Sequence, residues 1–471
     1  MNGIEKCEVA IVGGGLAGLS TALRLADHGV PVMVLEKGRD EHYPCNARFS
    51  GGVFHICFHH VNDDEARLVE AIRQNTRGFA KAELAAAVAR DTRTAVQWLK
   101  GKGIQFIKGG QDTFRENTLA PALPAKPGLN WPGRGADVLM QTLARALENG
   151  GGRLLRGASA KRLRMDGVRC VGLETEYQGR AVSVDARSVV LCDGGFQANL
   201  ALLREYVMPK PEKLKQRNAG TGNGDALQMA REVGAQLVGM DRFYGHLLAR
   251  DAMHNDALWP YPMVDFVCTA GILVDAAGRR FVDEGLGGVY MTNQLARLAD
   301  PLSAVLVYDE AIWNGPGHGH VLPANPHLIA GGAKIHKAQD LRSLGVELGL
   351  PAGALEATIA EYNAALAADQ SARLAPPRTA ISYKPYPIKQ PPYYALPLCA
   401  GITFTMGGIA TDDVGRVLNG QNVAIPGLYA AGCCTGGLDG GPNAGYVGGL
   451  AKSATMGLRT ADHLAALAHV R

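Results

Sequence analysis

A glycine-rich turn between two apolar segments near the N-terminus constrains the fold more than any other feature of this chain. The segment from Cys7 to Gly38 reads CEVAIVGGGLAGLSTALRLADHGVPVMVLEKG. This order predicts a strand, a GxGxxG turn, a helix with an apolar face and a second strand, the arrangement that binds dinucleotides. Gly13 permits the tight turn, Gly15 lets the backbone approach a pyrophosphate, and Gly18 lets the helix pack closely on the strand.

An acidic residue ends the second predicted strand and marks the ribose side of this motif. Glu36 follows the apolar residues 30–35, and its carboxylate is suited to accept hydrogen bonds from ribose hydroxyl groups. The same charge disfavours NADP, which carries a phosphate there. The start of the predicted helix, at Leu16 and Ala17, is expected to face the phosphates. The motif alone leaves NAD and FAD open.

Length and charge exclude several classes of protein. A chain of 471 residues exceeds what one hydrophobic core usually holds, so two or three domains are expected. The net charge of +4 favours neither a nucleic-acid partner nor an anionic membrane surface. No apolar run reaches the roughly 18 residues of a membrane helix, and we expect no signal peptide. The nine cysteines form no CxxC pair, which favours the cytoplasm and predicts neither a disulfide nor a metal site.

A second glycine-rich region near the C-terminus decides between the two cofactors. Residues 402–457 include TMGGIATD, IPGLYAAG and GYVGGLAKSATMG. We expect IPGLYAAG to be a short strand that brings Gly432 to the cofactor. GYVGGLAKSATMG is expected to be a turn that opens a helix, with the positive helix end facing an electron-rich ring. A ligand contacted by both ends of the chain is long, which favours FAD.

Taken together, the motifs resemble the flavoprotein family of fumarate reductases and succinate dehydrogenases, including its soluble branch. The matching pieces stand in family order over nearly the whole chain and are VAIVGGGLAGLSTALRLADHGVPVMVLEK, NARFSGG, GTGNGDALQMAREVGAQ, GILVDAAGRRFVDE, PPYYALPL, TMGGIATD and IPGLYAAG. The resemblance implies an α/β fold, with a discontinuous Rossmann-like FAD-binding domain and an inserted α+β capping domain. We expect FAD-binding segments at 1–240 and 386–471, and the capping, substrate-binding domain at 241–385.

The resemblance also implies how FAD is held. Binding is expected to be non-covalent, because the flavin-linked histidine of succinate dehydrogenases is absent and Cys45 stands near its place. The residues expected to contact FAD are Gly13, Gly15, Leu16, Ala17, Gly18, Glu36, Lys37, Arg48, Ser50, Gly51, Gly52, Gly194, Gly432, Cys433, Gly448, Gly449 and Leu450.

Three positions depart from the family pattern for handling a dicarboxylate. Gly288 stands where fumarate reductases keep a proton-donating arginine, Phe404 replaces a histidine, and Tyr446 replaces a substrate-binding arginine. Fumarate reduction and succinate oxidation are therefore not expected. The tyrosine is similar to two desaturating branches of the family, tricarballylate dehydrogenase and 3-ketosteroid Δ1-dehydrogenase.

The predicted reaction is desaturation of a C–C bond next to a ketone or carboxylate, in a small alicyclic or polycarboxylic substrate. It needs flavin N5 to take hydride, a base for the Cα proton and a donor for the enolate oxygen. Tyr446 is the expected donor, Tyr290 the expected acid or base, and His246 a substrate-side group. The expected substrate contacts are Phe404, Thr405, Arg250 and Gly449.

Alternative functions stay open at this point. The same site running backwards is an enoate reductase. A flavin hydroxylase or amine oxidase is disfavoured by the FVDE and TMGG elements, and a flavin-binding protein without turnover is a third possibility. The sequence shows no fused haem domain or iron–sulfur motif, so the expected electron acceptor is external: oxygen, a quinone or a redox partner.

Overall fold

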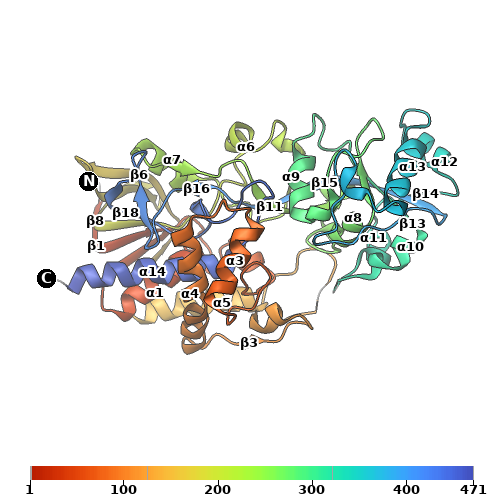
Figure 1. Cartoon of the computed structure of the whole chain (residues 1–471). Coiled ribbons are helices and arrows are strands. Elements are labelled where there is room, and N and C mark those ends of the chain that lie inside the picture. The colour runs from red at the N-terminus through yellow and green to blue at the C-terminus, as the bar shows by residue number, and fades with distance from the viewer. Residues whose placement is uncertain (1–2, 125, 321, 470–471) are drawn as a thin grey trace.

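Figure 1 shows a molecule of two parts, one that contains both chain ends and one built from the middle of the chain. The structure is a computed structural model that describes residues 3–124, 126–320 and 322–469. The outermost residues of the predicted FAD-binding segments, 1–2 and 470–471, lie outside the described residues.

A mostly parallel sheet forms the centre of the first part. Its strand order is β17-β18-β8-β1-β2-β5, and β7, which pairs with β8, also pairs with β6. β1 pairs in parallel with β2 and β8, and β18 pairs in parallel with β8. The strands are β1 (Gly3–Val12), β2 (Val32–Glu36), β5 (Arg153–Arg156), β6 (Ala158–Asp166), β7 (Arg169–Tyr177), β8 (Arg180–Leu191), β17 (Arg416–Leu418) and β18 (Ala424–Ala430). β2 is buried along its whole length, as expected for a parallel strand covered on both faces.

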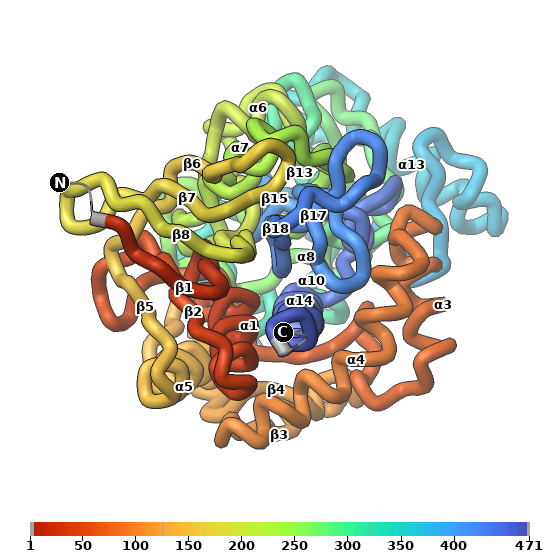
Figure 2. The backbone as a smooth tube through the Cα atoms, turned by 90° about the vertical axis from the view of Figure 1, so that its left-hand side faces the viewer, coloured from red at the N-terminus to blue at the C-terminus, as the bar shows by residue number. Residues whose placement is uncertain are grey.

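Helices from opposite ends of the chain cover this sheet. α1 (Leu16–Asp27) packs against α14 (Gly449–His469), and Thr21 Oγ1 donates to the Gly457 carbonyl across that contact at 3.0 Å. Figure 2 shows the C-terminal helix beside α1 and α4. The neighbouring helices are α3 (Glu65–Asn75), α4 (Ala82–Gly101) and α5 (Gly135–Asn149). Across the described ranges, no helix is long and apolar enough to cross a membrane.

The second part has a mostly antiparallel sheet of its own. Its strand order is β11-β15-β13-β12, with β14 and β9 also paired to β15. The strands are β9 (Lys215–Gln216), β11 (Phe243–Ala249), β12 (Ile272–Val274), β13 (Val305–Asp309), β14 (His336–Ala338) and β15 (Tyr393–Thr405). The helices around it are α8 (Asp265–Ala270), α9 (Gly288–Ala296), α10 (Glu310–Asn314), α11 (Ala324–Ala330), α12 (Leu341–Glu347) and α13 (Ala354–Ala367).

Short helices and strands lie between these elements along the chain. They are α2 (Asn46–Phe49), β3 (Phe106–Ile107), β4 (Thr118–Leu119), α6 (Leu200–Tyr206), α7 (Asp225–Glu232), β10 (Leu237–Val238) and β16 (Gly408–Ile409). Of these, β10 and β16 pair as a separate antiparallel ribbon.

The pairing of β15 bears on the predicted domain boundaries. β15 begins after residue 385, yet it pairs with β11 and β13 of the second sheet. The proline-rich stretch before it is mostly irregular, and the chain rejoins the first sheet only at β17 and β18. We therefore propose that the inserted part spans about residues 243–405, which keeps the paired strands β11, β12, β13, β14 and β15 in one unit, while the short β9 joins their sheet from the preceding segment.

Candidate active site

A cavity of about 1170 Å³ lies between the two parts. Residues of the β1–α1 turn and of α14 line one side, and residues of β11, α8 and α9 line the other. Its volume exceeds the roughly 300–1,000 Å³ that is usual for a small-molecule site. The cavity therefore has room for a dinucleotide together with a small substrate.

The turn before α1 forms the phosphate-binding end of the cavity. Gly15 precedes the helix in extended backbone and has no side chain to cap it. The backbone N–H groups of the first helical turn are therefore free to bind a ligand. Gly13, Gly15, Leu16 and Ala17 line the cavity, and Gly13 has a φ of +97°. Gly18 faces away from the cavity, where a Cβ atom would lie 2.0 Å from the Gly13 carbonyl oxygen. The tight turn at Gly13 and the close packing at Gly18 agree with this geometry, and the approach of Gly15 to a pyrophosphate stays a prediction.

Glu36 holds two loops and also lines the cavity. Its carboxylate accepts the backbone N–H of Gly14 at 2.8 Å and that of Gly38 at 2.6 Å. Burial raises the pKa of Glu36, against the lowering effect of these bonds. A carboxylate has further acceptor sites for ribose hydroxyls. Lys37 also lines the cavity and pairs with Asp225 at 2.8 Å.

Several polar atoms around the cavity are buried without a partner. In the part of the chain that the structure describes, five such atoms belong to cavity residues: Arg134 Nε, Asp193 Oδ1, Gln197 Oε1, Arg217 Nε and His320 Nδ1. An unpaired buried polar atom costs about 1–3 kcal/mol, which a ligand hydrogen bond removes. The other oxygen of Asp193 accepts the Ala226 N–H at 2.9 Å at the start of α7, and burial raises the pKa of Asp193 to about 7.

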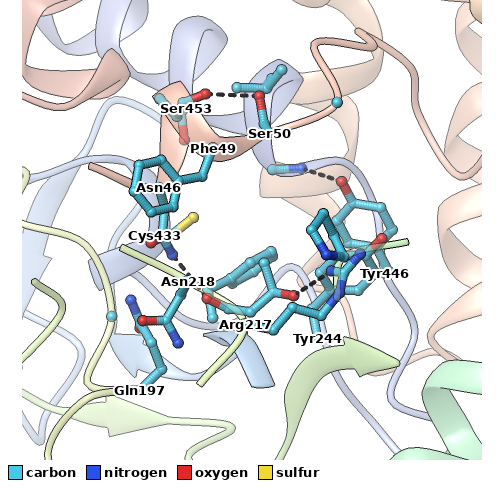
Figure 3. Close-up of a pocket in the computed structure, with 18 of the residues that line it drawn as sticks. Asn46, Phe49, Ser50, Gln197, Arg217, Asn218, Tyr244, Cys433, Tyr446 and Ser453 are labelled. Atoms are coloured by element: carbon cyan, nitrogen blue, oxygen red, sulfur yellow. Dashed lines mark hydrogen bonds between the residues drawn. The ribbon is translucent and has the colours of Figure 1, made fainter. Parts of the chain in front are cut away.

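A second helix terminus and an open backbone segment meet deeper in the cavity. Gly449, Leu450 and Ser453 of α14 line it, and Figure 3 shows Ser453 and Ser50 on the same side. Ser50, Gly51 and Gly52 line it as well, and a Cβ atom on Gly51 would meet no protein atom within 4 Å. Gly194 lines the cavity with equally open space. Two helix N-termini, unpaired polar atoms and open glycines fit an extended anionic cofactor such as FAD.

Four predicted cofactor contacts lie outside the cavity wall, and the first is Gly18, whose expected FAD contact is corrected to close packing on the Gly13 turn. Arg48 is fully buried, pairs with Asp137 of α5 and lies 5.2 Å from the ring centre of Tyr43. The single turn of α2 directs it toward α5, so its expected FAD contact is corrected to a structural role. Gly432 and Gly448 also do not line the cavity. Their Cβ atoms would lie 2.8 Å from the Ala17 side chain and 2.3 Å from the His55 carbonyl, so both allow close packing behind the wall.

Several thiols and imidazoles lie near the cavity. Burial raises the pKa of the Cys45 thiol to about 11 and also raises that of Cys433, and both residues line the cavity. Protonated thiols are poor nucleophiles, which supports non-covalent flavin binding. Burial lowers the pKa of His55 to about 4, and its Nδ1 accepts the Phe58 N–H at 3.1 Å. The described residues contain no group of three or more His, Cys, Asp or Glu side chains placed to hold a metal.

Two stacked tyrosines stand on the substrate side. The rings of Tyr244 and Tyr446 lie 3.9 Å apart at an angle of 21° (Figure 3). Tyr446 Oη accepts the backbone N–H of Gly449 at 3.1 Å, and no acceptor for its own proton is found among the described residues. Burial raises the pKa of Tyr446 well above its usual value, so the phenol stays protonated. Phe404 packs beside both rings.

A chain of hydrogen bonds reaches one of these tyrosines. His246 of β11 contacts the Asp265 carboxylate of α8 through Nδ1 and Tyr244 Oη through Nε2, the latter at 3.0 Å. All three residues line the cavity. Burial lowers the pKa of His246, although Asp265 opposes this effect. His246 therefore reaches the site as predicted, with partners that were not predicted.

The remaining predicted substrate residues divide between the cavity and its surroundings. Phe404, Gly449 and Tyr290 line the cavity, and burial raises the pKa of Tyr290. Thr405 is buried behind the wall, where its hydroxyl accepts the N–H of Phe196 at 3.1 Å. Thr403, two residues earlier in the chain, lines the cavity instead.

Arg250 lies outside the site. It is exposed and donates to the Leu302 carbonyl at 2.9 Å. β11 ends at residue 249, and the chain then turns away from the cavity. The predicted substrate contact of Arg250 is corrected on this geometry.

Several cavity residues were not predicted. Arg217 donates to Thr403 Oγ1 at 2.9 Å, and Asn46 donates to the Thr403 carbonyl at 2.8 Å. No carboxylate among the described residues lies within ion-pair distance of Arg217. Tyr244 stands two residues before His246, a spacing that places both on one face of a strand and was a usable signal. Asp265 gave no such signal, since it approaches His246 only through the packing of α8 on β11.

Comparisons with known proteins agree on family and fold. The family model described as "FAD binding domain" matches residues 8–445. A vinyl phenol reductase of Lactiplantibacillus plantarum is 24% identical over 93% of this chain and 92% of its own length. A 4-oxocyclohexanecarboxylate 2-dehydrogenase of Sinomonas cyclohexanicum is 25% identical over 97% of this chain and 92% of its own.

The likeness to solved structures is distant in sequence and close in fold. A 3-ketosteroid Δ1-dehydrogenase of Sterolibacterium denitrificans superposes with a TM-score of 0.75 at 21% identity, covering 98% of this chain and 100% of that one. A flavocytochrome c3 fumarate reductase superposes with a TM-score of 0.68 at 22% identity, covering 98% and 78%. The expected FAD-binding fold and the FAD cofactor are confirmed.

Proposed function

This chain belongs to the FAD-binding flavoprotein family, and on that premise we propose that it desaturates the bond next to the ketone of a small alicyclic keto acid. Its membership makes it an FAD-dependent oxidoreductase that acts on C–C or C=C bonds of small substrates. Bound FAD supplies the two-electron acceptance that desaturation requires. The residues that would hold it are those of the β1–α1 turn, Glu36, residues 50–52 and the start of α14.

One observation carries the proposal: the protonated Tyr446 phenol faces the cavity at the start of α14. The Gly449 N–H fixes its oxygen, and its proton is left for a ligand. A donor in this position stabilises the negative charge that develops on a ketone oxygen when a neighbouring C–H bond loses its proton. One neutral donor suits the single negative charge of a ketone enolate, whereas an ionised carboxylate would become a dianion and would need a cation at this place.

The walls around Tyr446 suit a compact ring. Tyr244, Tyr446 and Phe404 pack together and line the cavity with aromatic side chains, which bury apolar rings well. These contacts favour an alicyclic ketone over a polycarboxylate.

Arg217 supports the acid half of the substrate. Its guanidinium lines the cavity, is held by Thr403, and has an unpaired Nε atom. Burial raises the pKa of Tyr244 to about 12, and the positive charge of Arg217 acts against this increase. A planar cation without a carboxylate partner is well suited to bind a substrate carboxylate. The relative named as a 4-oxocyclohexanecarboxylate dehydrogenase has a substrate with this combination of groups.

The test is anaerobic bleaching of the yellow flavin absorbance by a substrate panel. We would compare 4-oxocyclohexanecarboxylate, cyclohexanone, 4-androstene-3,17-dione, tricarballylate and succinate. The proposal expects 4-oxocyclohexanecarboxylate to bleach the flavin and to appear as an enone in the product analysis.

Two results would contradict it. If no saturated compound bleaches the flavin but an unsaturated acid reoxidises the dithionite-reduced enzyme, the protein is a reductase. If neither happens with fully flavin-loaded protein, it binds flavin without this chemistry.

A further inference from the structure

We propose that Tyr244, His246 and Asp265 form a proton relay in which Tyr244 takes the Cα proton of the substrate and passes its own proton to His246. This inference rests on the proposed function for the identity of the substrate. It replaces Tyr290, the residue expected from the sequence, as the group that exchanges the proton.

The carboxylate end of the relay is held rigidly. Asp265 opens α8, and its Oδ1 accepts the backbone N–H of Leu247 at 3.2 Å while Oδ2 contacts His246 Nδ1. The side chains of His246 and Asp265 are 12% and 15% exposed, so water competes weakly for this contact. Two attachments from one strand therefore fix the carboxylate beside the imidazole.

The hydrogen bonds assign the direction of the relay. An ionised carboxylate only accepts, so the proton of a neutral His246 must be on Nδ1. The lone pair on Nε2 is then the acceptor for the Tyr244 hydroxyl, 3.0 Å away. Tyr244 is left with oxygen lone pairs toward the cavity, and its own proton already points to a base.

Backbone geometry at the start of α9 makes room for the carboxylate. A Cβ atom on Gly288 would lie 2.4 Å from Asp265 Cγ and 2.5 Å from its Oδ1. Any side chain at that position would displace Asp265 from His246. The glycine that breaks the expected arginine pattern thus accommodates a carboxylate in the same place.

Tyr244 is better placed than Tyr290 for proton exchange. Its ring stacks on Tyr446 at 3.9 Å, which puts the group for the Cα proton next to the donor for the ketone oxygen. Tyr290 has no histidine or carboxylate hydrogen-bond partner among the described residues. Burial raises the pKa of Tyr290, and a phenol with a raised pKa needs such a partner to act as a base.

The step balances in atoms and electrons. The Cα–H bond breaks, its electron pair forms the C=C bond, and its proton joins Tyr244 Oη as the Tyr244 proton moves to His246 Nε2. The second hydrogen leaves the neighbouring carbon with its electron pair, the oxidation for which FAD is the acceptor. The imidazolium, stabilised by Asp265, later loses its proton to water. In the reverse direction the same groups deliver a proton.

The first test needs no substrate. Long-range ¹H–¹⁵N spectra of ¹⁵N-histidine-labelled, FAD-loaded enzyme report the tautomer of each imidazole, and His246→Gln identifies the signal. We expect a neutral imidazole protonated on Nδ1, with an Nε2 resonance that moves in Tyr244→Phe. A proton on Nε2, or a cationic ring at neutral pH, would overturn the relay.

The second test follows proton exchange apart from oxidation. Anaerobic enzyme in D₂O is incubated with 4-oxocyclohexanecarboxylate, and deuterium in the recovered ketone is measured by mass spectrometry. Tyr244→Phe and His246→Gln should each slow enzyme-dependent exchange by at least about 100-fold, the scale of general acid–base catalysis. Their flavin content and melting temperature should equal those of Tyr393→Phe, a matched change of a residue outside the cavity.

The outcomes separate this inference from the proposed function. Exchange lost in Tyr290→Phe but kept in Tyr244→Phe would overturn the relay and leave the function standing. If wild-type enzyme neither exchanges nor is bleached by any panel compound, the proposed function fails, and the tautomer measurement alone decides the relay.

Discussion

The two walls of the cavity are built from different kinds of groups. On the nucleotide wall, which comprises the β1–α1 turn and residues 50–52, backbone groups and glycines make the surface. On the substrate wall, which comprises β11, α8 and residues 443–449, side chains from distant segments meet. Where the backbone packs closely on itself, as at Gly13 and Gly18, it has no room for an added atom, whereas a side-chain surface can lose a reactive group and keep its shape. The predictions below test this difference, from the largest expected effect to the smallest.

The nucleotide wall should fail when one methyl group is added. In Gly18→Ala the new Cβ would lie 2.0 Å from the Gly13 carbonyl oxygen, so α1 must move from the turn. We expect colourless protein and a loss of more than about 4 kcal/mol in unfolding free energy, a size reached only by such disruptions. Flavin-to-protein ratio and thermal unfolding measure both effects.

The matched control for that variant is Gly101→Ala at the end of α4. No atom lies within 4 Å of a Cβ atom there, and the backbone is helical. It should keep its flavin and change stability by less than about 1 kcal/mol. Equal behaviour of the two variants would contradict the role of close backbone approach.

The substrate wall has one structural support that should also be sensitive. Lys452 and Asp439 form a buried ion pair at 2.6 Å, and Asp439 accepts the Val447 N–H at 2.7 Å, next to Tyr446. Lys452→Met leaves a buried carboxylate without its cation and should cost about 3–5 kcal/mol. Chemical denaturation measures this loss.

The double variant Lys452→Met/Asp439→Leu is the control. It removes both charges and should recover much of that stability. A double variant as unstable as the single one would show that the charges themselves do not set the cost.

Chemistry on the substrate wall should be separable from cofactor binding. Tyr446→Phe removes the donor for the ketone oxygen but keeps the ring that stacks on Tyr244. Turnover should fall by roughly 100- to 1,000-fold, as for loss of an oxyanion donor, while flavin content is unchanged. Steady-state rates and flavin spectra check this, and an unaltered rate would remove Tyr446 from the mechanism.

The smallest expected effects concern two arginines, one that lines the cavity and one that lies outside it. Arg217→Leu should raise KM for 4-oxocyclohexanecarboxylate by about 10- to 100-fold, the value of a charged hydrogen bond, and leave KM for cyclohexanone unchanged. Arg250→Ala should leave KM unchanged and should change the free energy of unfolding by no more than about 0.5 kcal/mol, because the side chain is exposed outside the cavity. If Arg217→Leu raised KM equally for both ketones, Arg217 would not bind the substrate carboxylate.

The nucleotide wall was predictable because its interactions are local in the sequence. A strand, a glycine turn and a helix fold together within 36 residues, and Glu36 returns to bond the Gly14 N–H of the same turn. The second glycine cluster indicated FAD because α14 had to contact the same ligand. The cofactor followed from these short patterns, and the fold and enzyme class followed from the resemblance of the motifs, taken in order, to a flavoprotein family.

The substrate wall was decided by tertiary packing. Whether Thr403 or Thr405 faces the cavity depends on the path of β15. Arg48 points toward α5 because it forms an ion pair with Asp137 of that helix. Asp265 and His246 meet only when α8 packs on β11, into space that Gly288 leaves open. The sequence by itself determined where the backbone would bind a dinucleotide, because backbone geometry follows from neighbouring residues. Side-chain contacts between distant segments depend on how the two parts pack, and the tertiary structure alone decided them.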